Sequence, residues 1–331
     1  MIVTPGSSDR ISCLAVPPSR NIPDVIQDAS DGLIETPRTM APKYFYDARG
    51  SQLFDAICNT PEYYPTRAEE SLLRRYARKI IALVQPDHII EFGSGTSRKT
   101  RYLLDACQDA GCNVTYWPFD VCEPVLRESG TALINEYAGL TVRPLVGDYH
   151  GGLEQMPQPQ GSCLYLFLGG TIGNFEPEPA HLFLAELSSR MCSGDAFLMG
   201  ADRVKHPDIL HAAYNDAAGI TADFNLNLLH VLNRELDADF DVDGFRHQAI
   251  YNVRRERIEM YLVSDCEQQV RLGALDCEIQ LDSGEEILTE ISRKFTRDSL
   301  LALLTDTGFS LRQHFEAVDQ LYSLVLARSV Q

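Results

Sequence analysis

Basic side chains and long apolar runs are both scarce in this chain of 331 residues. Lysine and arginine together number 29 against 47 aspartates and glutamates, so the formal net charge is −18. Such a surface repels the phosphate backbone of nucleic acids and the anionic lipids of a membrane. No apolar run approaches the ~18 residues needed to cross a bilayer. We therefore expect neither a nucleic-acid nor a membrane partner.

Metal-binding motifs are also missing from the sequence. The nine cysteines include no CxxC pair and no zinc-finger spacing, and the eight histidines include no HExxH. An odd number of cysteines in a long chain is typical of reduced, mostly buried thiols. The N-terminal region has polar side chains and a Pro17-Pro18 pair instead of the apolar segment of a secretory signal. We expect a monomeric, cytoplasmic protein without a structural metal.

The beginning of the chain differs in pattern from the rest. Residues 1–40 are rich in Pro, Ser and Asp without periodicity, which predicts a tail ordered only where it lies on the body. Regular structure is expected from about Pro42. Thr66 and Glu69 have the spacing of a capping box, and the apolar residues that follow predict a helix to Val84.

Strand and helix patterns alternate from residue 88 to residue 200. The expected strands cover residues 88–92, 114–119, 142–146, 163–168 and 196–200, and the expected helices cover residues 99–107, 124–137 and 179–191. Strands separated by helices predict βαβ units and a parallel sheet covered on both faces. The chain is therefore expected to be an α/β protein with a Rossmann-like parallel sheet.

A second pattern begins after Asp202. Residues 206–234 look helical, and strand-like stretches follow at 245–263, 270–281 and 287–295 without helices between them. This predicts an α+β lobe inserted above the carboxyl ends of the parallel strands. A helix at 298–305 and strands at 310–315 and 321–327 then resume the first pattern. The predicted parts are an N-terminal segment that packs with the lobe (1–60), an α/β domain (61–202 and 296–331) and the inserted lobe (203–295).

A glycine-rich loop separates the first strand of the α/β domain from the next helix. Its sequence, EFGSGTS from Glu91 to Ser97, lets the backbone approach a ligand closely at the positive end of a helix. A dinucleotide fingerprint needs a third glycine at position 98, where this chain has Arg98. The E-x-G-x-G form resembles motif I of class I S-adenosylmethionine-dependent methyltransferases. By itself, the loop is equally compatible with a structural turn.

Two carboxylates follow the next strands of the expected sheet. Asp120 ends one strand and Asp148 follows another, where each carboxylate could accept hydrogen bonds from ribose hydroxyls or an adenine amino group. Each aspartate alone is more simply a solvated loop residue. Together with the glycine loop they favour a nucleoside cofactor, and acidic surroundings also suit the positive charge of a sulfonium.

Seven longer segments resemble the L-histidine Nα-methyltransferases of ergothioneine biosynthesis. They are NTPEYYPTR at 59–67, EFGSGTSRKT at 91–100, FLGGTIGN at 167–174, YNDAAG at 214–219, NRELDADFD at 233–241, RIEM at 257–260 and LTEISRKF at 288–295. The likeness extends from about residue 40 to the C-terminus. It implies a class I methyltransferase domain with an amino-acid-binding insertion. It also implies that S-adenosylmethionine is the methyl donor and that the α-amino group of L-histidine is trimethylated to hercynine.

The resemblance implies roles for individual residues as well. The positions implied to bind S-adenosylmethionine are Gly93, Lys99, Asp120, Asp148 and Tyr149. The positions implied to bind histidine are Tyr63, Gly169, Asn174, Tyr214, Met260, Glu290 and Ser292, and of these Tyr63 and Asn174 are also expected to act in catalysis. Two departures are mild: Gly170 stands where the family pattern has Ser, and Asn215 stands where it has Asp.

The residue pattern supports part of this assignment. Alternate side chains of a strand share a face, so Glu290 and Ser292 should lie roughly 7 Å apart and could engage both nitrogens of an imidazole. The alternative is an exposed edge strand with a solvated glutamate. Asn174 follows a glycine-rich turn at the ligand-binding edge, where its amide could donate to a substrate carboxylate together with Tyr214, or else cap the next helix.

Methyl transfer from a sulfonium is an in-line displacement that needs an aimed nitrogen and no covalent nucleophile. A tyrosine hydroxyl or an ordered water near Tyr63 and Asn174 could relay the proton that the α-ammonium group must lose. Three alternatives stay open: a methyltransferase of another small amine or amino acid, a nicotinamide-dependent oxidoreductase, and a ligand sensor without catalysis.

Overall fold

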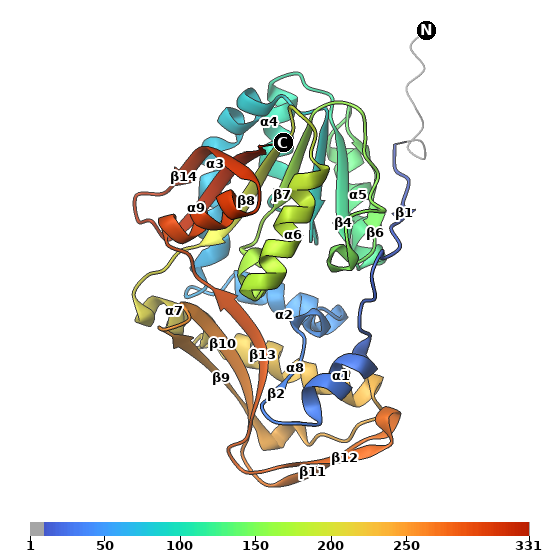
Figure 1. Ribbon diagram of the computed structural model, residues 1–331, viewed down its shortest axis with the longest axis vertical. Coiled ribbons are helices and arrows are strands. Elements are labelled where there is room, and N and C mark those ends of the chain that lie inside the picture. Colours follow the sequence, from blue (N-terminus) through green and yellow to red (C-terminus); the bar gives the residue numbers. More distant parts are fainter. Residues whose placement is uncertain (1–9, 331) are drawn as a thin grey trace.

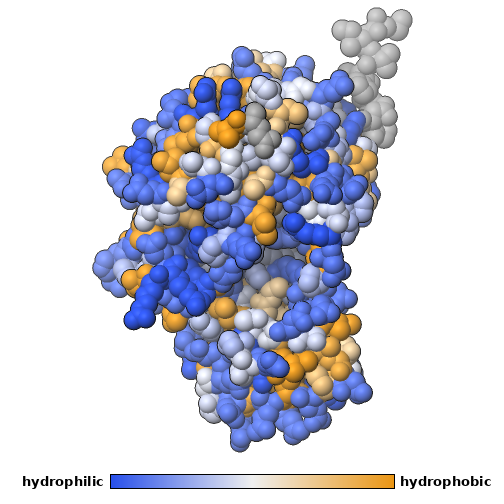
Figure 2. All heavy atoms as spheres, viewed as in Figure 1, coloured by the Kyte–Doolittle hydropathy of each residue, from blue (hydrophilic) through white to orange (hydrophobic). Residues whose placement is uncertain are grey.

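The computed structural model describes residues 10–330, which form two parts that follow one another along the long axis (Figure 1). The upper part is built on a nine-stranded sheet, and the lower part on a four-stranded sheet with a separate two-stranded hairpin. Figure 2 shows the surface hollowed where the two parts meet, with hydrophilic residues around the hollow. The first nine residues of the expected N-terminal tail lie outside the described residues.

The upper sheet runs in the order β1-β6-β4-β3-β7-β8-β15-β14, and β5 pairs with β4. The strands are β1 (Leu14–Ala15), β3 (His88–Phe92), β4 (Thr115–Asp120), β5 (Thr141–Val142), β6 (Leu145–Val146), β7 (Cys163–Phe167), β8 (Ala196–Asp202), β14 (Phe309–Glu316) and β15 (Tyr322–Ser329). Neighbouring strands are parallel except β15, which is antiparallel to β8 and β14. The predicted α/β fold with a parallel sheet is confirmed.

Helices cover both faces of this sheet. One face packs with α3 (Tyr64–Val84), α4 (Arg101–Asp109) and α5 (Glu123–Glu136), and the other with α6 (Pro177–Arg190) and α9 (Arg297–Asp306). Because both faces are covered, every residue of β7 and β8 is buried. This explains why these two strands read as continuous apolar runs in the sequence.

The predicted capping box at the start of α3 is wrong. The helix begins at Tyr64, so its N-cap is Tyr63 and not Thr66; Pro65 lies in its first turn and no side chain caps it. The Thr66 hydroxyl donates to Cys58 Sγ instead. Glu69 is fully buried and points into the protein, so it does not cap the helix despite its spacing from Thr66. The predicted C-terminal end at Val84 is confirmed.

Regular structure also begins earlier than the predicted start at Pro42. The segment before α3 contains β1, α1 (Val25–Leu33), β2 (Arg38–Thr39), the 3₁₀ turn η2 (Pro42–Phe45) and α2 (Ala48–Cys58). The two short strands add to different sheets, because β1 pairs with β6 in the upper part and β2 with β13 in the lower part. Strands of two residues carry no readable periodicity, so only their distant partners define them.

The lower sheet runs in the order β2-β13-β10-β9, and a hairpin of β11 and β12 lies beside it (Figure 1). Its further elements are α7 (Pro207–Tyr214), α8 (Ile220–Glu235), the 3₁₀ turns η5 (Val242–Gly244) and η6 (Gly273–Leu275), β9 (Phe245–Asn252), β10 (Arg257–Ser264), β11 (Gln268–Leu272), β12 (Cys277–Leu281) and β13 (Glu286–Arg293). One face of the sheet packs on α8 and forms a core separate from the two of the upper part.

Four predicted elements of the chain are divided in the structure. The strand-like stretches 245–263 and 270–281 each fold back as a hairpin, because turns at 253–256 and 273–276 interrupt them. The helical stretch 206–234 is broken between Tyr214 and Ile220, and the strand predicted at 142–146 is split into β5 and β6. The division of the chain at residues 60, 202 and 296 stays a prediction.

Candidate active site

The glycine loop after β3 is shaped by its backbone. Gly93 and Gly95 both have positive φ, at 65° and 49°, which side chains rarely adopt. A Cβ on Gly95 would meet nothing within 4 Å, so this loop borders open space. Asp120, at the end of β4, holds the loop because its carboxylate accepts from the backbone N–H of Gly95 (3.0 Å) and of Cys122 (3.1 Å). The structure therefore brings the predicted loop and Asp120 together.

Asp148 and Tyr149 extend this edge in the 3₁₀ turn η3 (Tyr149–Gly151) and the residue before it. Asp148 accepts from both the backbone N–H and the ring of His150 at 2.8 Å. Burial raises the pKa of Asp148, but the hydrogen bonds and charge of His150 more than offset it, so the pKa lies below its usual value. The Tyr149 ring packs edge-on against Phe92 and Phe167. A carboxylate thus stands beside an aromatic wall, a combination that suits a nucleoside.

A buried ion pair positions Lys99 beside this loop. Lys99 Nζ lies 2.6 Å from Glu69 Oε2, and Glu69 also accepts from the Gly169 N–H (2.9 Å) and the Tyr322 hydroxyl (3.0 Å). The Glu69 side chain is fully buried, whereas 19% of the Lys99 side chain is exposed. The Lys99 ammonium can therefore meet a ligand, and the Gly169 amide, predicted for the substrate, is bonded to Glu69.

A β-bulge sets the direction of the predicted substrate residues on β13. Glu290 pairs with Met260 and Ser292 with Ile258, but the register then shifts so that Leu288, not Thr289, pairs with Tyr261. Without the bulge, Leu288 would share the face of Glu290 and Ser292. Glu290 and Ser292 lie on one face, as predicted, and β13 is an inner strand, so the alternative of an exposed edge strand is wrong.

Glu290 has an unusual environment for a carboxyl group. Burial raises its pKa to about 7, although the Lys294 charge and a hydrogen bond from Asn174 act in the opposite direction. Asn174 ends the 3₁₀ turn η4 (Thr171–Asn174) of the upper part, so this bond connects the two parts of the molecule. The alternative helix-cap role of Asn174 is wrong, because Glu176 occupies the cap position of α6.

Aromatic side chains close the site. Tyr63 and Tyr214 are both buried, and their rings meet edge-to-face with centroids 6.1 Å apart. Tyr46, which the sequence analysis missed, keeps 44% of its surface exposed. Burial of its hydroxyl raises the Tyr46 pKa, and the next largest contributions come from Glu290 and Tyr149. The Tyr46 ring packs edge-on against Phe54, and Phe54 packs edge-on against Tyr63, so Tyr46 belongs to the aromatic cluster beside the site. Only its place in an aromatic cluster after residue 43 could have pointed to it.

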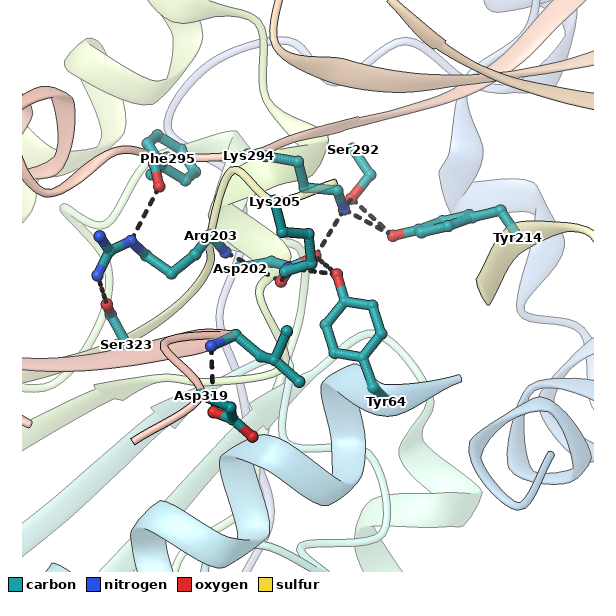
Figure 3. A network of polar contacts seen from close by, with 11 residues as sticks. Tyr64, Asp202, Arg203, Lys205, Tyr214, Ser292, Lys294, Phe295, Asp319 and Ser323 are labelled. Carbon is teal, nitrogen blue, oxygen red and sulfur yellow. Dashed lines mark hydrogen bonds and ion pairs between the residues drawn. The ribbon is translucent and has the colours of Figure 1, made fainter. Parts of the chain in front are cut away.

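A polar network behind Ser292 was also missed (Figure 3). Lys294 is fully buried, forms an ion pair with Asp202 at 2.9 Å, and donates to the hydroxyls of Tyr214 (3.0 Å) and Ser292 (2.8 Å). The Tyr214 hydroxyl donates to Ser292 Oγ at 2.9 Å. Tyr64 and Lys205 both bond to Asp202. The Tyr214 hydroxyl therefore lies beside Ser292, and its predicted contact with a substrate carboxylate stays a prediction.

Three further observations on residues 10–330 concern metal ions, membrane spans and a surface cavity. Within this range no group of three His, Cys, Asp or Glu residues could hold a metal ion. No helix in the same range is long and apolar enough to span a membrane. A surface cavity of about 520 Å³ lies elsewhere, on the outer face of the lower sheet beside Arg38, Arg257 and Tyr261, and contains none of the predicted site residues.

The sequence is similar to those of known methyltransferases over most of its length. The profile of the family described as "Histidine-specific methyltransferase, SAM-dependent" matches residues 25–329. The histidine N-alpha-methyltransferase of Mycobacterium tuberculosis is 47% identical over 282 residues, covering 85% of this chain and 88% of that protein. The protein of the same name from Mycolicibacterium smegmatis is 48% identical, covering 87% and 88%. "Ergothioneine biosynthesis protein 1" of Neurospora crassa is 32% identical and covers 68% of this chain, which spans 28% of that protein.

Proposed function

Because the chain belongs to the family of S-adenosylmethionine-dependent, histidine-specific methyltransferases, we propose that it trimethylates the α-amino nitrogen of L-histidine to hercynine, within ergothioneine biosynthesis. One observation carries the choice of histidine. Glu290 and Ser292 share one face of β13, the face on which Met260 and Ile258 lie in the neighbouring strand. An acceptor beside a hydroxyl matches the two nitrogens of an imidazole.

The cofactor edge fits S-adenosylmethionine. The space beside Gly95 is open, and a Cβ on Gly93 would contact only the Tyr149 ring, at 3.7 Å. Asp120 bonds to the Gly95 N–H, and Asp148 precedes Tyr149. We assign Asp120 and Asp148 to the nucleoside hydroxyls and base, and the Lys99 ammonium to the carboxylate of the donor. When bound, S-adenosylmethionine supplies the electrophilic methyl group.

The substrate residues would fix both ends of the amino acid. Glu290 and Ser292 hold the imidazole against Met260, and the Tyr214 hydroxyl donates to Ser292 behind the ring. Asn174 and Tyr63 anchor the α-carboxylate and orient the amine. Each transfer forms a nitrogen–carbon bond, breaks the sulfur–methyl bond and requires the amine to be deprotonated beforehand. We assign the relay of that proton to the Tyr63 hydroxyl or to an ordered water that Tyr63 and Asn174 hold, which passes the proton on to solvent. Because both ends of the amino acid stay fixed, its nitrogen can gain successive methyl groups without new contacts to the protein.

Mass spectrometry of histidine incubated with S-adenosylmethionine tests the activity. We expect mono-, di- and trimethylated histidine to appear in sequence, and synthetic dimethylhistidine to end as the same trimethyl product. Tryptophan and tyrosine serve as competing substrates, and calorimetry with S-adenosylmethionine and NAD compares the cofactors. Faster turnover of tryptophan, or binding of NAD alone, would contradict the proposal.

We further propose that the protein acts as a monomer in the cytoplasm. All nine cysteines are free thiols, which suits a reducing compartment. Analytical ultracentrifugation at several concentrations, with and without S-adenosylmethionine, checks the monomeric state. A mass twice that of the chain would contradict it.

A further inference from the structure

Lys294 does not face the hollow, yet it contacts both hydroxyls beside the imidazole site. We propose that Lys294 is a positioning residue that makes the Ser292 hydroxyl an obligate hydrogen-bond donor toward the ligand. The site would then accept histidine only with a neutral imidazole, one nitrogen donating to Glu290 and the other accepting from Ser292. This inference rests on the proposed function and concerns how the substrate ring is read.

The three N–H groups of the Lys294 ammonium are all committed. They point to Asp202 Oδ2 at 2.9 Å, the Tyr214 hydroxyl at 3.0 Å and Ser292 Oγ at 2.8 Å. The Lys294 side chain is fully buried, and that of Asp202 is 5% exposed. Burial alone would lower the pKa of Lys294, but Asp202 more than offsets this, so the pKa is raised and the amine stays charged. An ammonium has no lone pair, so it only donates.

The direction of the Ser292 hydrogen bond follows from a count of donors and acceptors. A serine oxygen carries two lone pairs and one hydrogen. Lys294 donates to this oxygen, and so does the Tyr214 hydroxyl at 2.9 Å. Both lone pairs are then used, and the one hydrogen left must find an acceptor outside the network. The network therefore converts a hydroxyl that could accept or donate into one that donates.

Glu290 provides the complementary half of this recognition. It lies on the same face of β13 as Ser292, two residues away, with Met260 as its cross-strand neighbour. An ionised carboxylate accepts and cannot donate. A neutral imidazole has one N–H and one acceptor nitrogen and satisfies both groups. An imidazolium has two N–H groups, so one of them would face the Ser292 hydrogen, and a ring without an acceptor nitrogen would leave that hydrogen unpaired.

Lys205 provides a matched control for Lys294. Both lysines pair with Asp202 and both are nearly or fully buried, with 6% and 0% of their side chains exposed. Lys205 donates to Tyr64 and Asp202, however, and not to the hydroxyls of Ser292 and Tyr214 that Lys294 contacts. A loss of general stability should follow from either change, whereas a change in ring recognition should follow only from loss of Lys294.

The test compares histidine with the 2-pyrrolyl and 3-pyrrolyl analogues of alanine. Each analogue keeps one ring N–H and replaces the other nitrogen with carbon, so it cannot accept from Ser292. In the wild type we expect kcat/KM for histidine to exceed that of the better analogue by at least about tenfold, the effect of one unpaired buried donor. Lys294→Met should lower this ratio by about tenfold, Ser292→Ala should do the same, and the double variant should lower it no further.

Lys205→Met should leave the histidine-to-pyrrole ratio at the wild-type value, whatever it does to activity. If Lys294→Met does not fold, Lys294→Gln replaces it, because the amide oxygen gives the Ser292 hydrogen an internal acceptor and should lower the ratio as well. Equal loss of activity toward histidine and pyrrole in the Lys294 variants would overturn the inference and leave a structural role. Absence of histidine turnover in the wild type would instead overturn the proposed function, on which the inference rests.

Discussion

Two buried carboxylate–lysine pairs lie near the carboxyl end of β8, where Glu69 approaches Gly200 and Asp202 ends the strand. Glu69 and Lys99 stand on the cofactor side, and Asp202 and Lys294 on the substrate side. Each carboxylate also accepts from a tyrosine, Tyr322 at 3.0 Å in the first pair and Tyr64 at 2.6 Å in the second. The lysines differ in exposure, since 19% of the Lys99 side chain is accessible and none of that of Lys294.

Because their lysines differ in exposure, the two carboxylate–lysine pairs can have different roles. An exposed ammonium can contact a ligand charge directly, so the carboxylate behind it serves to aim it. A sealed ammonium can act only through the groups that it touches, here the hydroxyls of Tyr214 and Ser292. The exposure of the lysine therefore decides whether the pair attracts a ligand charge directly or orients the neighbouring hydroxyls.

The largest expected effect breaks the sealed pair. Asp202→Ala should lower the free energy of unfolding by about 3–5 kcal/mol, because it leaves the buried Lys294 without its carboxylate. Glu69→Ala should cost about 1–3 kcal/mol, since Lys99 can turn toward water and only the Gly169 and Tyr322 donors lose their acceptor. Urea denaturation measures both. The half-exposed Asp109→Ala is the control and should cost less than about 1 kcal/mol. A larger loss of unfolding free energy in Glu69→Ala than in Asp202→Ala would contradict this difference between the two pairs.

The next effect tests ring recognition on the substrate side. Glu290→Ala should reduce transition-state binding of histidine by about 1.5–3 kcal/mol, the range for hydrogen bonds to charged groups. Tryptophan should lose less, because it never satisfied that carboxylate, so the ratio of kcat/KM for histidine over tryptophan should fall. Glu286→Ala, an exposed position on the same strand, is the control and should not change the ratio. An unchanged ratio in Glu290→Ala would mean that the imidazole is read elsewhere.

The cofactor side should respond through affinity for the methyl donor. Lys99→Met should weaken S-adenosylmethionine binding by about 1.5–3 kcal/mol, because the donor carboxylate loses a charged partner. Calorimetry with S-adenosylmethionine measures the change. Lys79→Met, at an exposed position of α3, is the matched control and should bind normally. Normal binding by Lys99→Met as well would show that the exposed ammonium does not contact the donor.

The smallest effect concerns pH. Burial raises the pKa of Glu290 to about 7, while Lys294 and Asn174 partly offset that rise. The ionised form accepts the imidazole N–H, so affinity should be full above this pH and fall as the pH drops through it, by up to about tenfold per unit. Hercynine is the ligand to use, because its trimethylated nitrogen does not titrate. Its own imidazole, with a pKa of about 6.5, adds a second decline.

Glu290→Gln should remove the Glu290 part of this decline and leave that of the imidazole. Calorimetric titrations of hercynine at several pH values between 5.5 and 8 compare the variant with the wild type. Equal pH dependence of the two proteins would show that Glu290 does not titrate at the ligand.

The elements that the sequence predicted well are those whose signal is local. β3, β7, β8 and the helices between them read as long apolar or periodic runs, because both faces of the upper sheet are buried. Glu290 and Ser292 were found because two residues on one strand share a face. The missed elements depend on partners more than a hundred residues away, as in the pairing of Arg38 with Ile287.

The site residues that the sequence did not predict also depend on distant partners. Glu69 has the sequence spacing of a capping box, and only the distant Gly169 and Tyr322 reveal its role. Lys294 follows Ser292 by two residues in the sequence, but its contacts with Asp202 and Tyr214 come from the fold. The bulge at Thr289 is invisible in a simple alternation, because an extra residue changes the face of the strand without changing its composition.

The segment before α3 and α3 itself connect the part of the described chain that is synthesised first to parts that are synthesised late. β2 gains its partner only when Ile287 has been made, and Glu69 meets Tyr322 only after a further stretch of translation. Contacts over such separations form slowly. The apolar residues of α1 and α2 that belong to the lower core therefore stay uncovered during most of synthesis. A nascent chain halted before β13 should bind chaperones, and one that includes β15 should be released from them.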